Sequence, residues 1–112
     1  MFAEDDAVLQ GTVELLILKR LSGRPMHGYG IARWIETATH DVLRVEEGSL
    51  YPALYRMMRK GWIKGEWGTS ENNRRAKFYR LTKAGQRELE QQAHGWVRLS
   101  EAVSRAVTST DV

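Results

Sequence analysis

The spacing of apolar residues predicts two helices in the first third of the chain. Residues 9–22 are apolar around most of a helical circumference, so this helix should be buried on more than one side. The stretch Ser22-Gly23-Arg24-Pro25 ends it, through its glycine and its proline. Residues 28–39 place their apolar positions at mixed spacings of three and four, which is typical of an amphipathic helix. Two glycines at its start would let it approach a neighbouring helix closely.

A third helix is predicted around Pro52. Residues 42–45 are β-type but too few to predict a strand, and residues 46–49 read as a turn. Proline fits a helix best in the first turn, so Pro52 should mark the helix start and Gly61 its end. One face of this helix is apolar, and it contains Leu50, Ala53, Leu54, Met57 and Met58. The opposite face is polar, basic and aromatic, and it contains Ser49, Pro52, Tyr55, Arg56, Arg59 and Lys60.

From Trp62 onward the pattern changes to short, aromatic, roughly alternating segments. Residues 62–67 and 76–81 read as the two strands of a hairpin, joined by the turn-rich residues 68–73. Thr82 is a suitable N-cap for a last helix over residues 83–107. Apolar residues recur along that helix at spacings typical of a seam for pairing with another helix. The seam consists of Leu89, Ala93, Trp96, Leu99, Val103 and Ala106.

The order of three helices, a hairpin and a helix predicts a mainly α fold with a β-hairpin wing. This is the order of a winged helix-turn-helix followed by a C-terminal dimerisation helix. A chain of 112 residues suits one structural domain. Within it, residues 1–82 would form the DNA-binding region and residues 83–112 the dimerisation helix.

The basic residues are concentrated where this fold would meet DNA. The net charge is only +3, yet residues 59–83 hold eight basic residues against two acidic ones, a local balance of +6. Such a stripe fits either a nucleic-acid surface or a solvated charged face, and charge alone does not decide between them. Its position on the third helix and the hairpin favours DNA.

Composition argues against several other classes of protein. The chain has no cysteine, its three histidines show no metal-ligand spacing, and no nucleophile pattern or phosphate-binding loop is visible. We therefore expect no metal, no cofactor and no enzymatic activity, with His27 a structural or capping residue. The acidic N-terminus is unlike a secretory signal and no apolar run could span a bilayer, so we expect a cytoplasmic protein.

Several motifs, in order, resemble the PadR family over about residues 9–106. They are Leu9-Gln10-Gly11-Thr12, Leu15-Leu16-Ile17-Leu18, His27-Gly28-Tyr29-Gly30-Ile31-Ala32, Glu47-Gly48-Ser49-Leu50-Tyr51-Pro52-Ala53-Leu54 and Arg74-Arg75-Ala76-Lys77-Phe78-Tyr79-Arg80-Leu81-Thr82. The resemblance implies a dimeric transcriptional regulator, usually a repressor. The short tail is similar to the branch of the family with a single C-terminal helix.

The DNA-binding candidates lie on the third helix and on the wing. They are Ser49, Tyr51, Pro52, Tyr55, Arg56, Arg59, Asn73, Arg74, Arg75 and Lys77. Ser49 could also serve as the N-cap of its helix, and Tyr51 lies at the border between the buried and exposed faces. The wing cations could instead be solvated strand residues, and Asn73 suits a turn because asparagine tolerates left-handed backbone.

Trp96 has two interpretations, as interface core or as the wall of a cavity between two subunits. Some relatives of the family bind flat apolar effectors in such a cavity. The lining candidates are then Val8, Leu15, Trp96 and Leu99.

We expect a homodimer that represses transcription from a pseudo-palindromic operator and is released by a small aromatic effector. Its recognition helices would enter successive major grooves about 34 Å apart. The alternative is a winged-helix module that binds a protein or a ligand without specific DNA binding.

Overall fold

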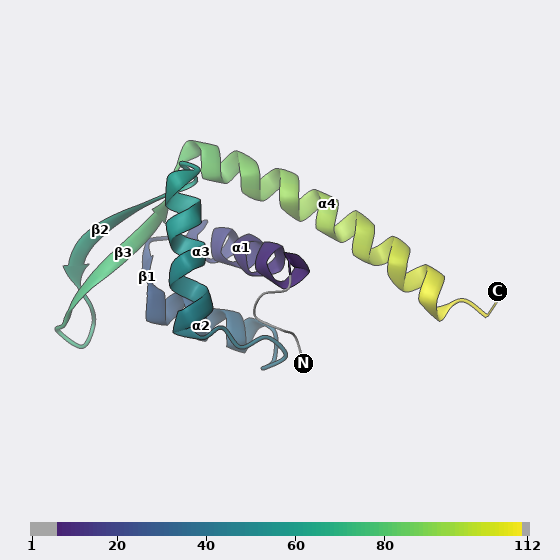
Figure 1. The fold of residues 1–112 in the computed structure, drawn as a ribbon, viewed down its shortest axis with the longest axis horizontal. Coiled ribbons are helices and arrows are strands. Elements are labelled where there is room, and N and C mark those ends of the chain that lie inside the picture. Colours follow the sequence, from purple (N-terminus) through teal and green to yellow (C-terminus); the bar gives the residue numbers. More distant parts are fainter. Residues whose placement is uncertain (1–6, 111–112) are drawn as a thin grey trace.

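The computed structural model describes residues 7–110, with side chains from Gln10 onward. These residues form a helix-rich fold with a small antiparallel sheet (Figure 1), as predicted. The elements are α1 (Ala7–Leu21), β1 (Met26–His27), α2 (Gly28–Ala38), α3 (Glu47–Arg59), β2 (Ile63–Thr69), β3 (Arg75–Leu81) and α4 (Lys83–Thr108).

Helix α1 lies at the centre of the packing, which explains why it is apolar on most sides. It contacts α2, α3, α4 and β3. Ile17 and Leu18 are fully buried against Ile31 and Ile35 of α2 and against core residues of α3 such as Met57. The core is therefore formed by three helices around α1 and is closed by the base of the sheet.

The start of α2 is set by His27, whose expected capping role is confirmed. The His27 Nδ1 accepts a hydrogen bond of 3.0 Å from the backbone N–H of Gly30. Met26 and His27 also pair with Tyr79 and Phe78 of β3 as a two-residue strand that the sequence pattern had not indicated. The sheet order is β1-β3-β2, so β3 is the central strand.

Helix α3 begins earlier than predicted. Glu46 is its N-cap residue, and its carbonyl accepts from the backbone N–H groups of Ser49 and Leu50 at 3.0 and 2.9 Å. The prediction that Pro52 opens the helix is therefore wrong, and so is an N-cap role for Ser49. Pro52 lies inside the helix, where it removes one backbone hydrogen bond. Burial of Leu50, one turn ahead of the apolar face formed by Leu54 and Met57, holds the first turn in place despite that loss.

Gly61 ends α3 as predicted. Its φ of +77° is left-handed, a conformation that favours glycine. The N–H of Gly61 donates to the Met58 carbonyl and that of Trp62 to the Met57 carbonyl, each at 3.0 Å. This paired arrangement turns the chain sharply from α3 into β2.

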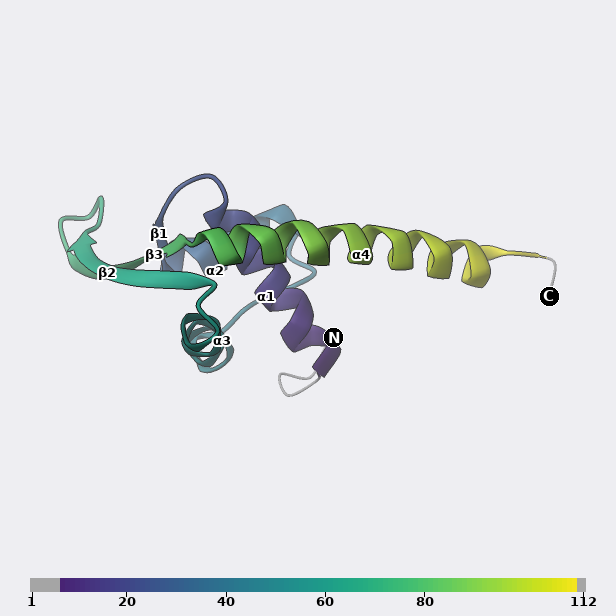
Figure 2. The same ribbon diagram turned by 90° about the horizontal axis from the view of Figure 1, so that it is seen from above.

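Helix α4 begins at the predicted cap and runs through Gly85 and Gly95 without a break. The Thr82 hydroxyl accepts from the N–H of Gly85 at 3.0 Å. The molecule measures 57 × 29 × 23 Å, and Figures 1 and 2 show that α4 accounts for the long dimension by projecting beyond the body. None of the helices in residues 7–110 is long and apolar enough to cross a membrane.

Candidate nucleic-acid interface

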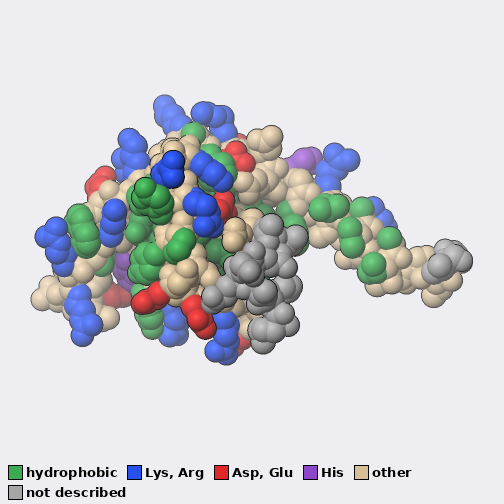
Figure 3. Space-filling model, in the orientation of Figure 1, with side chains coloured by type: hydrophobic (Ala, Val, Ile, Leu, Met, Phe, Trp, Pro, Cys, Tyr) green, Lys and Arg blue, Asp and Glu red, His purple; other side chains and the backbone are tan. Residues whose placement is uncertain are grey.

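The outer face of α3 is exposed, aromatic and basic. Tyr55 is 59% exposed, and the guanidinium of Arg59 lies 5.8 Å from the centroid of its ring. Tyr51 and Pro52 are also exposed, whereas Ser49 is half-buried. Figure 3 views the molecule from the side on which α3 lies in front, and Lys and Arg side chains gather there over α3 and the wing. This face offers both cations and ring edges to a ligand.

Arg56 is less free than the predicted outward orientation implies. Its Nε–H donates to Glu14 Oε2 of α1 at 3.0 Å, and Lys60 Nζ lies 3.5 Å from Glu14 Oε1. Glu14 is 8% exposed, and no other charged side chain among those described is buried. Glu14 is not among the predicted functional residues, because it stands within an apolar helical run. An acidic residue at such a position signals that a cation must reach it from another element.

One face of the wing continues this surface. Cross-strand pairing places Trp67 opposite Lys77 and Thr69 opposite Arg75 on the same side of the sheet. Trp67 is 62% exposed, and the guanidinium of Arg75 lies 4.8 Å from the centroid of its ring. Trp67 is not among the residues predicted to bind DNA. Trp67 follows Gly65 by two residues on an alternating strand, so the two residues share a face of the hairpin. This position was the signal that could have identified Trp67 from the sequence.

The tip of the wing is a tight turn built by polar residues. Asn73 has a φ of +58°, so its expected role as a turn former is confirmed. The backbone N–H of Ser70 donates to the Arg74 carbonyl at 2.8 Å, and the N–H of Asn73 donates to the Ser70 carbonyl at 2.9 Å. Arg74 is therefore exposed at the tip, ahead of Arg75 at the start of β3.

Tyr51 lies where α2, α3 and the sheet meet. A Cβ on Gly28 would stand 2.8 Å from its hydroxyl oxygen. Burial, together with the nearby Tyr51, raises the pKa of the Tyr79 phenol above its ordinary value. Tyr51 of α3 therefore contacts the start of α2 and lies near Tyr79 of β3.

A groove of about 330 Å³ lies between α1 and α4. Three of the predicted effector-pocket residues, Leu15, Trp96 and Leu99, line it. Its other lining residues are Gly11, Thr12, Gln92 and Gly95. Val8 belongs to α1, but its side chain lies outside those that the structure describes.

The predicted seam of α4 divides into two parts. Leu89 is 7% exposed and Ala93 packs against the same core, so both serve the packing of their own chain. Trp96, Leu99 and Val103 are exposed, as is Ala106 further along. Trp96 and Leu99 face α1 across the groove, and the C-terminal part of α4 projects beyond the body (Figure 1).

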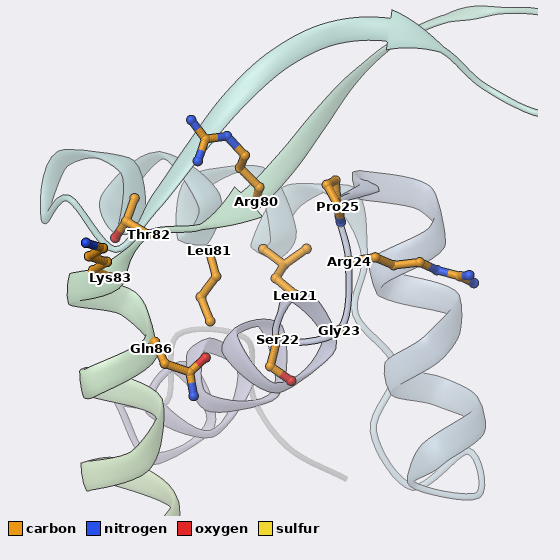
Figure 4. A pocket seen from close by; sticks show the side chains of 10 residues that line it. All are labelled: Leu21, Ser22, Gly23, Arg24, Pro25, Arg80, Leu81, Thr82, Lys83 and Gln86. Atoms are coloured by element: carbon orange, nitrogen blue, oxygen red, sulfur yellow. The ribbon is translucent and has the colours of Figure 1, made fainter.

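A second groove, of about 370 Å³, lies between the α1–β1 loop and the start of α4. Figure 4 shows Leu21 and Leu81 pointing into it, while the charged ends of Arg24 and Arg80 point away. Arg80 Nε is paired instead with Glu66 Oε1 at 3.3 Å. Arg24 and Arg80 therefore do not converge on one ligand position in this groove.

These features together define a winged helix-turn-helix protein with a basic, aromatic surface over α3 and the wing. The model of the transcriptional regulator PadR-like family matches residues 17–91, and the chain belongs to that family. The resemblance seen in the sequence motifs is thereby confirmed.

Solved structures and curated relatives agree with this assignment. A transcriptional regulator from Clostridium thermocellum is 29% identical with a TM-score of 0.79, over 93% of this chain and all of that one. A PadR-like transcriptional regulator from Bacillus cereus is 28% identical with a TM-score of 0.79, over 93% of this chain and 99% of that one. An uncharacterized protein X from Lysinibacillus sphaericus is 24% identical over 86% of this chain and 88% of its own length.

One relative is much longer than this chain. A 37.1 kDa protein in transposon TN4556 of Streptomyces fradiae is 34% identical over 88% of this chain, which spans only 27% of that protein. The family and the structural neighbours are transcriptional regulators and not enzymes. The chain is accordingly a DNA-binding transcriptional regulator.

Proposed function

We propose that this regulator is a repressor that acts as a homodimer on a pseudo-palindromic operator. The exposed face of α3, with Tyr55 and Arg59 opposite the buried Leu54, is the observation that carries the proposal. A recognition helix needs an apolar inner face to fix its angle and an outer face that reaches base edges and phosphates.

On this proposal α3 reads the major groove and the wing holds the DNA backbone. Tyr51, Tyr55 and Arg59 contact bases or nearby phosphates, with Ser49, Pro52 and Arg56 beside them. Arg74, Arg75, Lys77 and Asn73 contact phosphates from the wing, and Trp67 packs with Arg75 on the same face.

The dimer is proposed to form through α4. Trp96, Leu99 and Val103 leave an apolar strip exposed on a helix that projects from the body, and a second copy of the helix would bury it. On this proposal residues 1–82 belong to the DNA-binding region, and residues 83–112, which contain α4, belong to the dimerisation region. Two recognition helices about 34 Å apart would occupy successive major grooves.

A small aromatic effector is proposed to bind in the groove lined by Leu15, Trp96 and Leu99. Because the groove joins α1 to the dimerisation helix, its occupation would favour one relative placement of the two subunits over another. Release from DNA is then a shift between two dimer geometries with different DNA affinity.

The alternative is a winged-helix module that binds a protein or a ligand without sequence-specific DNA binding. Salt dependence separates the two functions. Contacts to several phosphates weaken steeply as salt rises, whereas an apolar pocket responds little.

The test begins with duplexes selected by the wild-type protein from a random library over several rounds of binding. Fluorescence anisotropy then measures affinity for the selected duplex and for a scrambled duplex of the same composition, at several salt concentrations. Arg75→Ala should weaken both affinities and reduce the slope of log K against log salt by about 0.9. Arg24→Ala is the matched control, because the α1–β1 loop lies on the side opposite α3 (Figure 2). Equal affinity of the wild type for both duplexes would favour the alternative.

A further inference from the structure

We propose that Glu14 of α1 is a positioning residue that sets the DNA specificity of the recognition helix. Its carboxylate holds Arg56 and Lys60 of α3 in one fixed arrangement. The inference rests on the proposed function, because it assigns a role to a residue that lies behind the DNA-contacting face.

The geometry assigns one carboxylate oxygen to each cation. Arg56 Nε–H donates to Oε2 at 3.0 Å, and Lys60 Nζ lies 3.5 Å from Oε1. The Glu14 side chain is 10% exposed, whereas those of Arg56 and Lys60 are 37% and 47% exposed. The acid is therefore hidden beneath two cations that reach the surface.

Burial makes this arrangement stiff. A carboxylate removed from water is strongly destabilised unless cations and hydrogen-bond donors surround it. Glu14 is flanked along α1 by the buried Val13, Ile17 and Leu18. The cations that neutralise its carboxylate therefore come from α3. Releasing either cation would leave the carboxylate poorly compensated, and both are consequently held.

A held arginine discriminates better than a free one. The bond from Nε leaves the terminal nitrogens, which carry four of the five guanidinium donors, for a base edge or a phosphate in one register. An unrestrained Arg56 would bind phosphates on any DNA sequence. It would also lose more side-chain entropy when it bound one particular base or phosphate. The carboxylate also offsets one positive charge of the pair, which lowers sequence-independent attraction to DNA.

Glu14→Gln tests this assignment, since it keeps the shape of the side chain but removes its charge. The ratio of affinities for the selected and scrambled duplexes should fall about tenfold, with affinity for the scrambled duplex unchanged or slightly higher. Glu66→Gln is the matched control. It makes the same change in charge and breaks the pair with Arg80 on the wing, where both partners are exposed, so it should leave the ratio unchanged.

A second variant keeps the test valid if the loss of Glu14 unfolds the protein. Arg56→Lys retains the positive charge. A single ammonium group cannot, however, bind Glu14 and at the same time present a planar fork of donors to DNA, so this variant should lower the same ratio with little change in stability. In an Arg56→Gln, Lys60→Gln background, Glu14→Gln should have no further effect on the ratio.

Two outcomes would overturn the role of Glu14 while leaving the proposed function intact. One is a wild type that discriminates between the duplexes and a Glu14→Gln or Arg56→Lys variant that discriminates equally well. The other is a Glu14→Gln substitution that lowers the ratio in the doubly substituted background as much as it does in the wild type. A wild type that enriches no sequence would instead overturn the proposed function itself, and this role with it.

Discussion

The hydroxyl group of Tyr51 occupies the space that a Cβ atom on Gly28 would need. An ideal Cβ built there lies 2.8 Å from the hydroxyl oxygen and 3.1 Å from two ring carbons. The first residue of α2 and helix α3 can therefore approach this closely only because residue 28 is glycine. The close approach to a neighbouring helix that the sequence suggested for both glycines of α2 is confirmed for Gly28, whereas Gly30 packs against Met26. The contact at Gly28 fixes the position of an exposed aromatic ring on α3.

Gly28→Ala should move the Tyr51 ring and weaken DNA binding. The ring can shift outward, so we expect a loss of about 1 kcal/mol or less in the free energy of unfolding. The affinity for the selected duplex should fall severalfold, which fluorescence anisotropy would measure.

Gly30→Ala provides the comparison for this prediction. A Cβ at that position meets the side chain of Met26 and not Tyr51. Its DNA affinity should stay near that of the wild type, and equal losses in the two variants would contradict a specific role for Tyr51.

Gly85→Ala should destabilise the whole chain. A Cβ at Gly85 would collide with the backbone carbonyl oxygen of Trp62, which also accepts from the N–H of Thr82 at 3.0 Å. Because backbone cannot yield as a side chain can, we expect a loss of about 3 kcal/mol or more in urea unfolding. Gly95→Ala lies in open space on the same helix and should stabilise it by about 0.5–1 kcal/mol. A neutral Gly85→Ala would show that α4 does not pack on the start of β2 in solution.

Trp96→Ala should abolish binding of planar aromatic cations in the α1–α4 groove. Such probes should quench tryptophan fluorescence in a saturable manner in the wild type, because they would stack on the exposed ring. Trp34, Trp62 and Trp67 contribute background emission, so the saturable part of the signal is the quantity to compare. Val97→Ala is the control, since Val97 is exposed on α4 but does not line the groove. Saturable quenching that survives Trp96→Ala would place the effector site elsewhere.

Stability should fall at high pH through Tyr79. Burial first, and Tyr51 second, raise the pKa of this phenol above its ordinary value of 10.0. The native chain therefore keeps a proton that the unfolded chain loses, so the free energy of unfolding decreases as pH rises above about 10. Tyr79→Phe should make that decrease shallower in urea unfolding measured between about pH 8 and 11.

Tyr29→Phe serves as the control for this pH dependence. Tyr29 is exposed, and its variant should follow the wild-type curve. A Tyr79→Phe variant with the full wild-type decrease would show that other groups cause the loss of stability at high pH.

The sequence indicated the order of the main elements because their signals are local. The apolar periodicity gave the four helices, the alternating aromatic segments gave the two long strands, and His27, Gly61 and Thr82 acted at helix or strand boundaries. Each of these features depends on a few neighbouring residues and on backbone geometry. The placement of basic residues on α3 and on the wing likewise followed from helix and strand periods.

The early start of α3 and the strand β1 could not be derived in the same way. Pro52 is unfavourable inside a helix, and only the burial of Leu50 in a core formed by distant elements outweighs the lost hydrogen bond. Residues 26 and 27 carry no strand pattern. They form a strand only because they pair with β3, some fifty residues later in the chain.

The candidate site shows the same division. Face and position indicated Tyr55, Arg59, Arg74 and Arg75 from the sequence alone. Only the tertiary structure placed Glu14 beneath Arg56 and Arg75 over the ring of Trp67. It also buried Leu89 in the core of its own chain, away from the exposed part of the seam. Local sequence determines which side chains share a face, whereas the partner across the core is decided by how distant elements pack, because that contact has no period along the chain.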